Sequence, residues 1–217
     1  MTSTLFLNTV TPLLLSTLTD LMAAKEFKKF RLVGGTSLSL QLGHRKSVDI
    51  DLFTDANYGT IDFTAIDRFL TKNYPYTDSY ASDIIGLGKS YYIGQSMNDC
   101  IKLDLYYTDS FIRPYLEIEN IRFATIEEII AMKVDVISRI GRKKDFWDLH
   151  ELLENYSIEQ MLELHKERYP YTHNRKEILL TFINFDKADD DFNPICLRQK
   201  YWEAIKLDIN DKIKGLV

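Results

Sequence analysis

The spacing of hydrophobic residues predicts a helix, a strand and a second helix in the first part of the chain. Leu14, Leu18, Leu21 and Met22 recur at helical spacing, which indicates an amphipathic helix near the start. The segment "KFRLVGG" then predicts a short strand that ends in a glycine turn. "TSLSLQLG" predicts a short helix that stops at Gly43, a residue type that commonly ends helices.

The segment "SVDIDLF" alternates strictly between apolar and acidic residues. On a strand, Val48, Ile50 and Leu52 would face one way, and Asp49 and Asp51 would face the other. Two carboxylates on one face of a strand repel each other. Something close to them must therefore offset this repulsion.

A helix over residues 60–72 and two paired strands, "YYIGQ" and "CIKLDLYY", are expected next. In the second of these strands the apolar side chains at 101, 103 and 105 face the core, whereas Lys102, Asp104 and Tyr106 share the opposite face. If this strand neighbours "SVDIDLF", three carboxylates converge.

The pattern becomes helical after residue 124. In "TIEE" the side chains of Thr125 and Glu128 form a predicted capping box at the start of a helix that runs towards Gly141. Further helices are expected in "KKDFWDLHELLENY", "RKEILLTFINF" and "RQKYWEAIKLDI". The sequence thus predicts an α+β fold, with an α/β domain in residues 1–123 and a helical C-terminal domain in residues 124–217.

Composition narrows the class of protein. The formal net charge of −5 argues against extended, non-specific binding to nucleic acid, which needs many cations on one face. The two cysteines, Cys100 and Cys196, have no CxxC spacing, so a disulfide framework or a cysteine-based zinc site is not expected. The N-terminal segment lacks the charge pattern of a signal peptide, and no segment reaches the ~20 apolar residues that span a bilayer. We expect a cytoplasmic protein without a membrane partner.

Asp49, Asp51 and Asp104 are candidate ligands for a hard cation such as Mg²⁺, which binds oxygen-only clusters and leaves positions for phosphate oxygens. The alternative is that these acids line the wet face of an edge strand, which is the commoner meaning of an isolated Asp-x-Asp. The glycine turn just before them supports the first interpretation, because a phosphate site and a metal site would then lie close together.

The turn itself offers several phosphate ligands. Gly34 and Gly35 allow close approach of a ligand to the backbone, and the following helix presents free amide groups. Thr36 and Ser37 carry hydroxyls, although either could simply cap the helix. Arg45 is a further candidate because its planar guanidinium matches phosphate geometry.

Lys133 lies within an apolar stripe formed by five isoleucines, 126, 129, 130, 137 and 140. A lysine in that position needs an anion, because a buried unpaired charge is costly. Asp145 and Asp148 lie on or beside the buried face of the next helix. Two interpretations remain open: Lys133 pairs with these acids and locks two helices together, or it acts at a nucleotide.

The run "RIGRKKD" supplies Arg139, Arg142, Lys143 and Lys144. Such a run is usually a solvated charged surface. It could also be a docking patch for an RNA acceptor.

The block "GGTSLSLQLGHRKSVDIDLF" resembles the opening motif of the AbiEii/AbiGii-type nucleotidyltransferase toxins, which belong to the polymerase-beta-like nucleotidyltransferase superfamily. "AMKVDVISRIGRKKDFWDL" is similar to the downstream Lys…Arg…Asp-x-x-Asp motif of that family. The resemblance implies a nucleotidyltransferase-like mixed β-sheet with flanking helices, followed by a helical lobe. It also implies Mg²⁺ or Mn²⁺, a nucleoside triphosphate as substrate, and a cognate antitoxin protein as partner.

The resemblance also implies roles for individual residues. Gly35 and Ser37 would hold the triphosphate, although the family's Gly-Ser is here Gly-Gly-Thr-Ser and leaves Thr36 as a second candidate. The acids at 49, 51 and 104 would bind metal. Lys133 and Asp148, with Asp145 close by, would form the downstream catalytic group.

The expected reaction is transfer of a nucleotide to an acceptor such as a tRNA 3′ end, with pyrophosphate as the leaving group. Asp104 could also be the base that activates the acceptor hydroxyl. Three alternatives remain open: a small-molecule or protein nucleotidyltransferase, a kinase-like phosphotransferase, and a non-catalytic partner-binding domain on the same scaffold.

Overall fold

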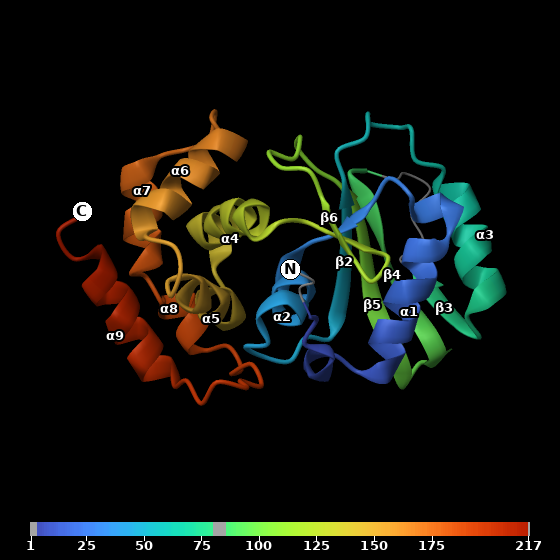
Figure 1. Ribbon diagram of the computed structural model, residues 1–217, viewed down its shortest axis with the longest axis horizontal. Helices are drawn as coiled ribbons and strands as arrows, with labels where there is room; N and C mark the ends of the chain where they lie inside the picture. Colours follow the sequence, from blue (N-terminus) through green and yellow to red (C-terminus); the bar gives the residue numbers. More distant parts are fainter. Residues whose placement is uncertain (1–3, 80–85, 217) are drawn as a thin grey trace. The chain divides into compact units, whose positions relative to one another are not determined.

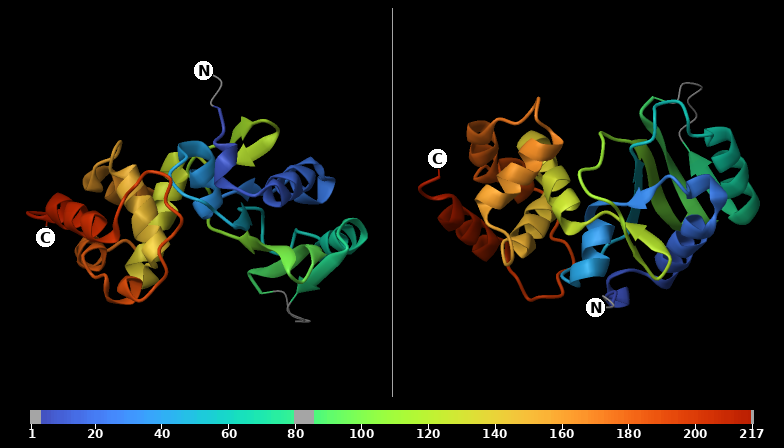
Figure 2. Two further views of the ribbon diagram at one scale, coloured as in Figure 1. Left: turned by 90° about the horizontal axis from the view of Figure 1, so that it is seen from below. Right: turned by 45° about the horizontal axis from the view of Figure 1, so that its top comes forward.

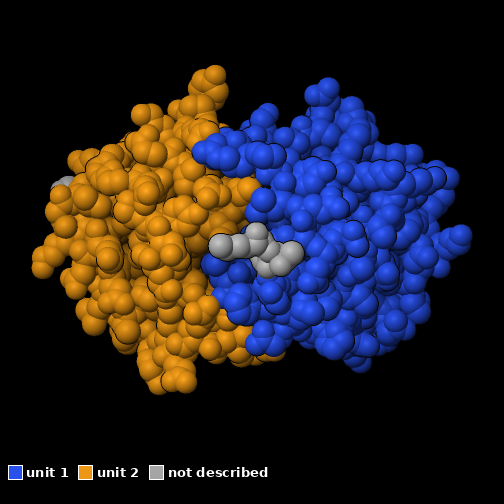
Figure 3. All heavy atoms as spheres, viewed as in Figure 1, with its two compact units in different colours: residues 1–42, 47–124 blue, residues 43–46, 125–217 orange. Residues whose placement is uncertain are grey.

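The computed structural model describes residues 4–79 and 86–216, and the chain divides into two compact units. Unit 1 consists of residues 1–42 and 47–124, and unit 2 of residues 43–46 and 125–217 (Figure 3). The division after residue 123 remains a prediction about domains. The main difference between the predicted domains and the compact units is the segment 43–46, which belongs to unit 2 although it lies within the first 123 residues.

A mixed β-sheet forms the centre of unit 1 (Figure 1). Across the sheet, the strands of the described residues are β3 (Tyr76–Ser79), β4 (Gly88–Ser96), β5 (Asp99–Tyr107), β2 (Asp49–Thr54), β1 (Arg31–Leu32), β7 (Ile121–Phe123) and β6 (Leu116–Ile118). The pairs β2–β5 and β1–β7 are parallel, and the other neighbours are antiparallel. The predicted mixed sheet is confirmed.

The alternation in "SVDIDLF" is realised in β2. Ile50 and Leu52 are fully buried, whereas Asp49 and Asp51 are only partly buried. The prediction for Val48 is wrong: it precedes the strand, which begins at Asp49, and its side chain is 65% exposed.

Helices α1 (Pro12–Ala23) and α3 (Phe63–Asn73) cover one face of the sheet (Figures 1 and 2). The predicted apolar stripe of α1 is buried, because Leu14, Leu18 and Leu21 pack into the core with the inward residues of β2 and β5. Helix α3 begins at Phe63, three residues later than predicted, since Asp62 caps its first turn. The opposite face of the sheet carries the acids.

Helix α2 (Gly34–Leu42) begins one residue after β1 and ends before Gly43, as predicted. It starts earlier than predicted, because the two residues of the expected glycine turn, Gly34 and Gly35, form the start of the helix. Gly43 has a φ of +71°, a conformation that favours glycine at a helix end. Two short 3₁₀ segments, η1 (Leu7–Thr9) and η2 (Lys25–Phe27), flank α1.

Unit 2 is helical, as predicted. Its elements are α4 (Ile126–Ile140), α5 (Lys143–Leu152), α6 (Ile158–Arg168), α7 (Arg175–Phe182), α8 (Asp186–Asp189) and α9 (Trp202–Ile213). Helix α4 packs against α5, α6 and α7, while α9 packs against α5 and α7 (Figure 1). Within the described part of the chain, no helix combines the length and apolar character needed to span a membrane.

The start of α4 differs in part from the predicted capping box. The Thr125 hydroxyl accepts a hydrogen bond from the backbone N–H of Glu128, 3.3 Å away. The Glu128 carboxylate is fully buried and pairs with the guanidinium of Arg168 on α6. Ile140 ends the helix and is 59% exposed, so it does not belong to the buried stripe.

Candidate functional site

Three carboxylates lie on one face of the sheet in unit 1. Strands β2 and β5 are parallel neighbours, and Asp51 is the register partner of Asp104. Asp49 lies two residues before Asp51 and therefore shares its face. All three side chains are partly buried. The structure thus brings together the acids that the sequence analysis singles out; we refer to this surface as the acid face.

A lysine supplies positive charge to the acid face. Lys102 Nζ donates to Asp104 Oδ2 at 2.5 Å, and Ser90 Oγ on β4 donates to Asp104 Oδ1 at 2.6 Å. Both oxygens of Asp104 are therefore engaged. Partial burial lowers the pKa of Lys102, but the hydrogen bond and charge of Asp104, with the charges of Asp49 and Asp51, outweigh that effect and raise the pKa.

The alternation of β5 predicts that Lys102 lies on this face but indicates no role for it, and no pattern in the sequence points to Ser90. The available signal was the Lys-x-Asp spacing of residues 102 and 104, which puts an ammonium and a carboxylate side by side on one strand. Ser90 reaches Asp104 only because β4 pairs with β5 in a register that makes the two residues direct partners.

The donor chemistry of the acid face fits a hard divalent cation, because every candidate ligand is a carboxylate oxygen. In the present arrangement, however, the described residues contain no group of three or more acids, histidines or cysteines poised to hold a metal ion. The Lys102 ammonium takes the place of such a cation, because it pairs with one oxygen of Asp104 and is attracted by the charges of Asp49 and Asp51.

The glycine turn approaches the acid face closely. Gly34 has a φ of +68°, and a Cβ added there would lie 2.5 Å from Asp51 Oδ2. The backbone N–H of Val33 donates to the carbonyl of Asp51 at 2.9 Å. Position 34 therefore requires glycine both for its backbone conformation and for its contact with the carboxylate.

The two candidate hydroxyls of α2 are buried. Thr36 Oγ1 donates to the carbonyl of Asp49 and lies 2.8 Å from Ser47 Oγ, so it attaches the start of α2 to the start of β2. Ser37 Oγ accepts from Gln41 Nε2 at 3.0 Å. These contacts indicate a framework role for Thr36, and Ser37 has no exposed surface in this arrangement.

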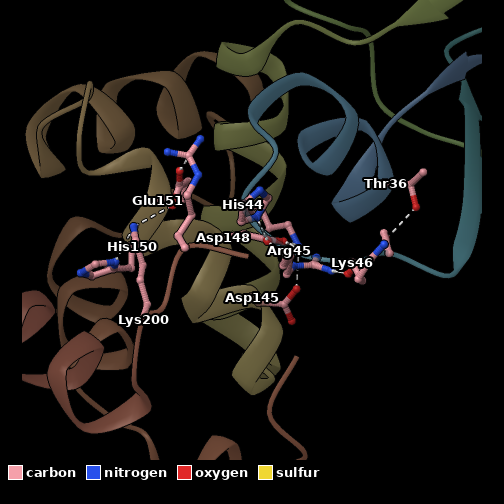
Figure 4. Close-up of polar contacts among 12 residues, drawn as sticks. Thr36, His44, Arg45, Lys46, Asp145, Asp148, His150, Glu151 and Lys200 are labelled. Carbon is pink, nitrogen blue, oxygen red and sulfur yellow. Dashed lines mark hydrogen bonds and ion pairs between the residues drawn. The ribbon is translucent and has the colours of Figure 1, made fainter. Parts of the chain in front are cut away.

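Unit 2 contains a second cluster of charges around Asp148 of α5 (Figure 4). Arg45 Nε and Nη2 donate to the two oxygens of Asp148 at 2.6 and 2.8 Å, and His44 Nε2 lies 2.7 Å from Oδ1. Asp148 has no exposed surface, and Arg45 is 3% exposed. Arg45 is predicted to bind phosphate, but in the structure its guanidinium pairs with the buried carboxylate of Asp148 instead.

Lys133 of α4 completes this cluster. Its Nζ lies 2.7 Å from Asp145 Oδ1 and 2.7 Å from Asp148 Oδ2. The other oxygen of Asp145 accepts from the backbone N–H of Arg142 at 3.1 Å. The structure therefore contains the pairing of α4 with α5 that was one of the two interpretations for Lys133. We call His44, Arg45, Lys133, Asp145 and Asp148 the buried network.

The charges within the buried network control its protonation. Burial raises the pKa of Asp148, but the positive charges of Arg45 and Lys133 outweigh it and hold the pKa well below its usual range. Burial likewise lowers the pKa of Lys133, but Asp145 and Asp148 outweigh it and raise the pKa. Asp148 and Lys133 are therefore both ionised at neutral pH.

The basic residues at the end of α4 and the start of α5 differ in how far their side chains are exposed. The side chains of Arg139 and Arg142 are 66% and 59% exposed, with ion pairs to Asp135 and Asp145. Lys143 is 6% exposed; its Nζ donates to the carbonyl of Asp189 at 3.2 Å. Lys143 is therefore a packing residue of unit 2 rather than part of an exposed patch. Lys144 is partly buried.

The family model "Nucleotidyl transferase AbiEii toxin, Type IV TA system" matches residues 16–213. An uncharacterised protein of Aquifex aeolicus is 27% identical over 197 residues, which cover 85% of this chain and 86% of that protein.

Solved structures with a similar fold include two proteins from bacteria. JHP933 from Helicobacter pylori gives a TM-score of 0.58 at 18% identity, covering 93% of this chain and 88% of that one. MenT4, a nucleotidyltransferase toxin from Mycobacterium tuberculosis H37Rv, gives a TM-score of 0.52 at 14% identity, with coverages of 94% and 84%.

Proposed function

Because this chain belongs to the AbiEii nucleotidyltransferase toxin family, we propose that it transfers a nucleotide from a nucleoside triphosphate to an acceptor hydroxyl with the help of a divalent cation. The observation that carries the proposal is the acid face: three carboxylates on two paired strands, with a glycine turn in contact with one of them.

Asp49, Asp51 and Asp104 are the residues that would hold Mg²⁺ or Mn²⁺. A bound divalent cation would neutralise the negative charge that develops on the reacting phosphate. Asp51 and Asp104 are direct register partners, so their carboxylates are well placed to share one ion.

The triphosphate would lie against the first turn of α2. The amides at this end of the helix point away from the helix and attract anions. The absence of a side chain at Gly34 allows the backbone to lie close to Asp51, where an added Cβ would be 2.5 Å from the carboxylate. Ser37 is the side chain that we assign to this site.

In the reaction, the acceptor oxygen forms a bond to the α-phosphorus, the bond from that phosphorus to the β-phosphate oxygen breaks, and pyrophosphate leaves. The acceptor hydroxyl loses its proton to a carboxylate of the acid face. Asp104 accepts hydrogen bonds from Lys102 and Ser90, so it acts as this base only after one of these donors has moved away.

We assign Lys133, Asp145 and Asp148 to the framework of unit 2 rather than to the chemistry. Their mutual ion pairs and deep burial support that role. A catalytic role for the three residues stays a prediction of the family motif. Arg45 joins the same framework through its two hydrogen bonds to Asp148.

The acceptor in this proposal is RNA, such as a tRNA 3′ end. Arg139 and Arg142 are the exposed cations of the basic run that would contact it, with the partly buried Lys144 beside them. A cognate antitoxin is the proposed protein partner, in line with the toxin–antitoxin description of the family. We propose a cytoplasmic location, because both cysteines are free thiols, as in a reducing compartment.

The proposal is tested by incubating the protein with each of four α-³²P-labelled nucleoside triphosphates, Mg²⁺ and total RNA, and by identifying the leaving group. We expect label on RNA and release of pyrophosphate. An Asp49→Asn, Asp51→Asn variant should lose the activity. Asp78→Asn, which changes an exposed acid on β3 of the same unit, is the matched control and should retain it.

Other results have defined meanings. A nucleoside diphosphate as product would indicate phosphoryl transfer instead. Label on protein or on a small molecule would support nucleotide transfer but show that the acceptor is not RNA. Absence of label from every acceptor, together with absence of nucleotide binding by the folded protein, would support the non-catalytic partner-binding alternative.

A further inference from the structure

We propose that Lys102 is a built-in competitor of the divalent cation: its ammonium holds Asp104 while the acid face is free of metal and must leave before metal binds. This inference rests on the proposed metal-dependent function, because it assumes that Asp49, Asp51 and Asp104 are the metal ligands.

The geometry at Asp104 carries the argument. Lys102 Nζ lies 2.5 Å from Oδ2, and Ser90 Oγ lies 2.6 Å from Oδ1. A metal ion binds a carboxylate through an oxygen lone pair and repels a neighbouring ammonium, so the ion and Lys102 do not share Asp104 favourably. Ser90 is neutral and presents no such conflict.

The position of Lys102 extends this conflict to the other two acids. Lys102 is the register partner of Asp49, and Asp104 is the register partner of Asp51. The four side chains therefore occupy two adjacent rows on one face, with a single ammonium among three carboxylates. That ammonium reduces the repulsion between the carboxylates, which is also what a bound metal ion would do.

Lys102 can be displaced without unfolding the sheet. Its side chain is 38% exposed, and it stands on a flexible four-carbon stem. Lys133 in the buried network has an exposed fraction of only 8% and contacts two carboxylates. The two lysines thus differ in mobility: Lys133 is fixed within a packed interior, whereas Lys102 borders solvent and can turn away when another cation arrives.

The test measures Mn²⁺ affinity of the full chain by isothermal titration calorimetry, without nucleotide. Lys102→Gln should bind Mn²⁺ about fivefold more tightly than the wild type, as expected when a partly exposed ion pair of this kind is removed. Lys102→Arg keeps the charge and should bind with nearly wild-type affinity.

The matched control is Lys89→Gln. Lys89 lies on β4 of the same unit and pairs with Asp67 of α3 at 2.8 Å, on the face of the sheet opposite the acids. The Lys89→Gln substitution changes the net charge by the same amount as Lys102→Gln and should leave the Mn²⁺ affinity nearly unchanged. An equal gain in Lys89→Gln would show a general charge effect and would overturn the inference.

A second measurement follows Lys102 directly in the wild type. The ε-methylene NMR signal of Lys102, assigned by its absence from Lys102→Gln, should shift as Mg²⁺ is added and its ion pair breaks. This readout stays valid if Lys102→Gln proves less stable than the wild type.

The two possible failures are distinguishable. If the wild type binds Mn²⁺ through Asp51, as shown by loss of binding in Asp51→Asn, but Lys102→Gln gains no affinity and the Lys102 signal does not move, the competition is disproved and the proposed function stands. If no variant binds Mn²⁺, the proposed metal site itself is wrong and the inference falls with it.

Discussion

The acid face of unit 1 and the buried network of unit 2 are both clusters of aspartates and cations, but their charges are balanced differently. The buried network sets two carboxylates against the cations Arg45 and Lys133, and these side chains are all less than a tenth exposed. The acid face sets three carboxylates against Lys102.

This is the difference that we expect between a framework cluster and the proposed binding site. A buried cluster of paired charges resists any change in its members, because loss of one charge leaves another unpaired. A cluster of carboxylates that borders solvent gains stability when it binds a cation. Each of the following predictions tests one side of this comparison.

The largest effect is expected in the buried network. Asp148→Asn keeps the shape of the side chain but removes the charge that Arg45 and Lys133 share, and it should lower the free energy of unfolding by about 3–5 kcal/mol. Urea denaturation followed by circular dichroism measures this change. Asp208→Asn, at a 62% exposed acid that pairs with His150 on the surface, is the control and should cost less than about 1 kcal/mol.

Acid should weaken the same network. The usual carboxyl pKa of 3.8 is lowered in Asp145 and lowered further in Asp148, so the unfolded chain binds protons at a higher pH than the folded one. Their stabilisation is present above about pH 4 and is lost as pH falls through the lowered folded values. Urea midpoints should fall more steeply below pH 4 in the wild type than in Asp148→Asn; parallel curves would contradict the assignment.

Lys133 determines the pH above which the network loses stability on the alkaline side. Its pKa lies above the usual 10.5 in the folded chain, so its contribution is complete below about pH 10.5 and is lost only as pH rises through the higher folded value. Between these limits the contributions of Lys133, Asp145 and Asp148 to stability should not depend on pH.

Gly34 tests how closely the glycine turn approaches the acid face. Gly34→Ala should destabilise the protein by about 2–3 kcal/mol, because alanine disfavours a positive φ and its methyl group would meet the Asp51 carboxylate. Gly59→Ala is the matched control. Gly59 also has a positive φ, +80°, but nothing lies within 4 Å of an added Cβ, so only the backbone cost of about 1 kcal/mol is expected.

Nucleotide binding should be affected in Gly34→Ala but not in Gly59→Ala, as measured by fluorescence titration with a labelled nucleoside triphosphate. Equal stabilities and equal affinities for the two variants would show that the approach of residue 34 to Asp51 has no consequence.

Alternation along a strand allowed the faces of β2 and β5 to be predicted from sequence, because side-chain direction has a period of two residues. Alternation does not identify neighbours across a sheet. The Asp51–Asp104 pairing and the contact from Ser90 depend on long-range register, which the sequence analysis could state only as a condition.

Short elements were harder to predict. The hairpin of β6 and β7 has strands of three residues, and its turn places Glu119 and Asn120 at φ of +51° and +63° without a glycine. No periodicity is visible over such lengths. The segment 43–46 is equally short, which is why burial of Arg45 could not be foreseen.

The smallest effect on stability is expected at the acid face itself. Asp51→Asn removes one of three like charges from a partly buried surface, so without divalent metal the free energy of unfolding should change by less than about 1 kcal/mol. The variant should differ from the wild type in its response to metal: Mg²⁺ should raise the melting temperature of the wild type by mass action but leave that of Asp51→Asn unchanged. Differential scanning fluorimetry with EDTA and with Mg²⁺ provides both values. If Asp51→Asn were instead as destabilising as Asp148→Asn, the acid face would be framework, and the distinction between the two clusters would be lost.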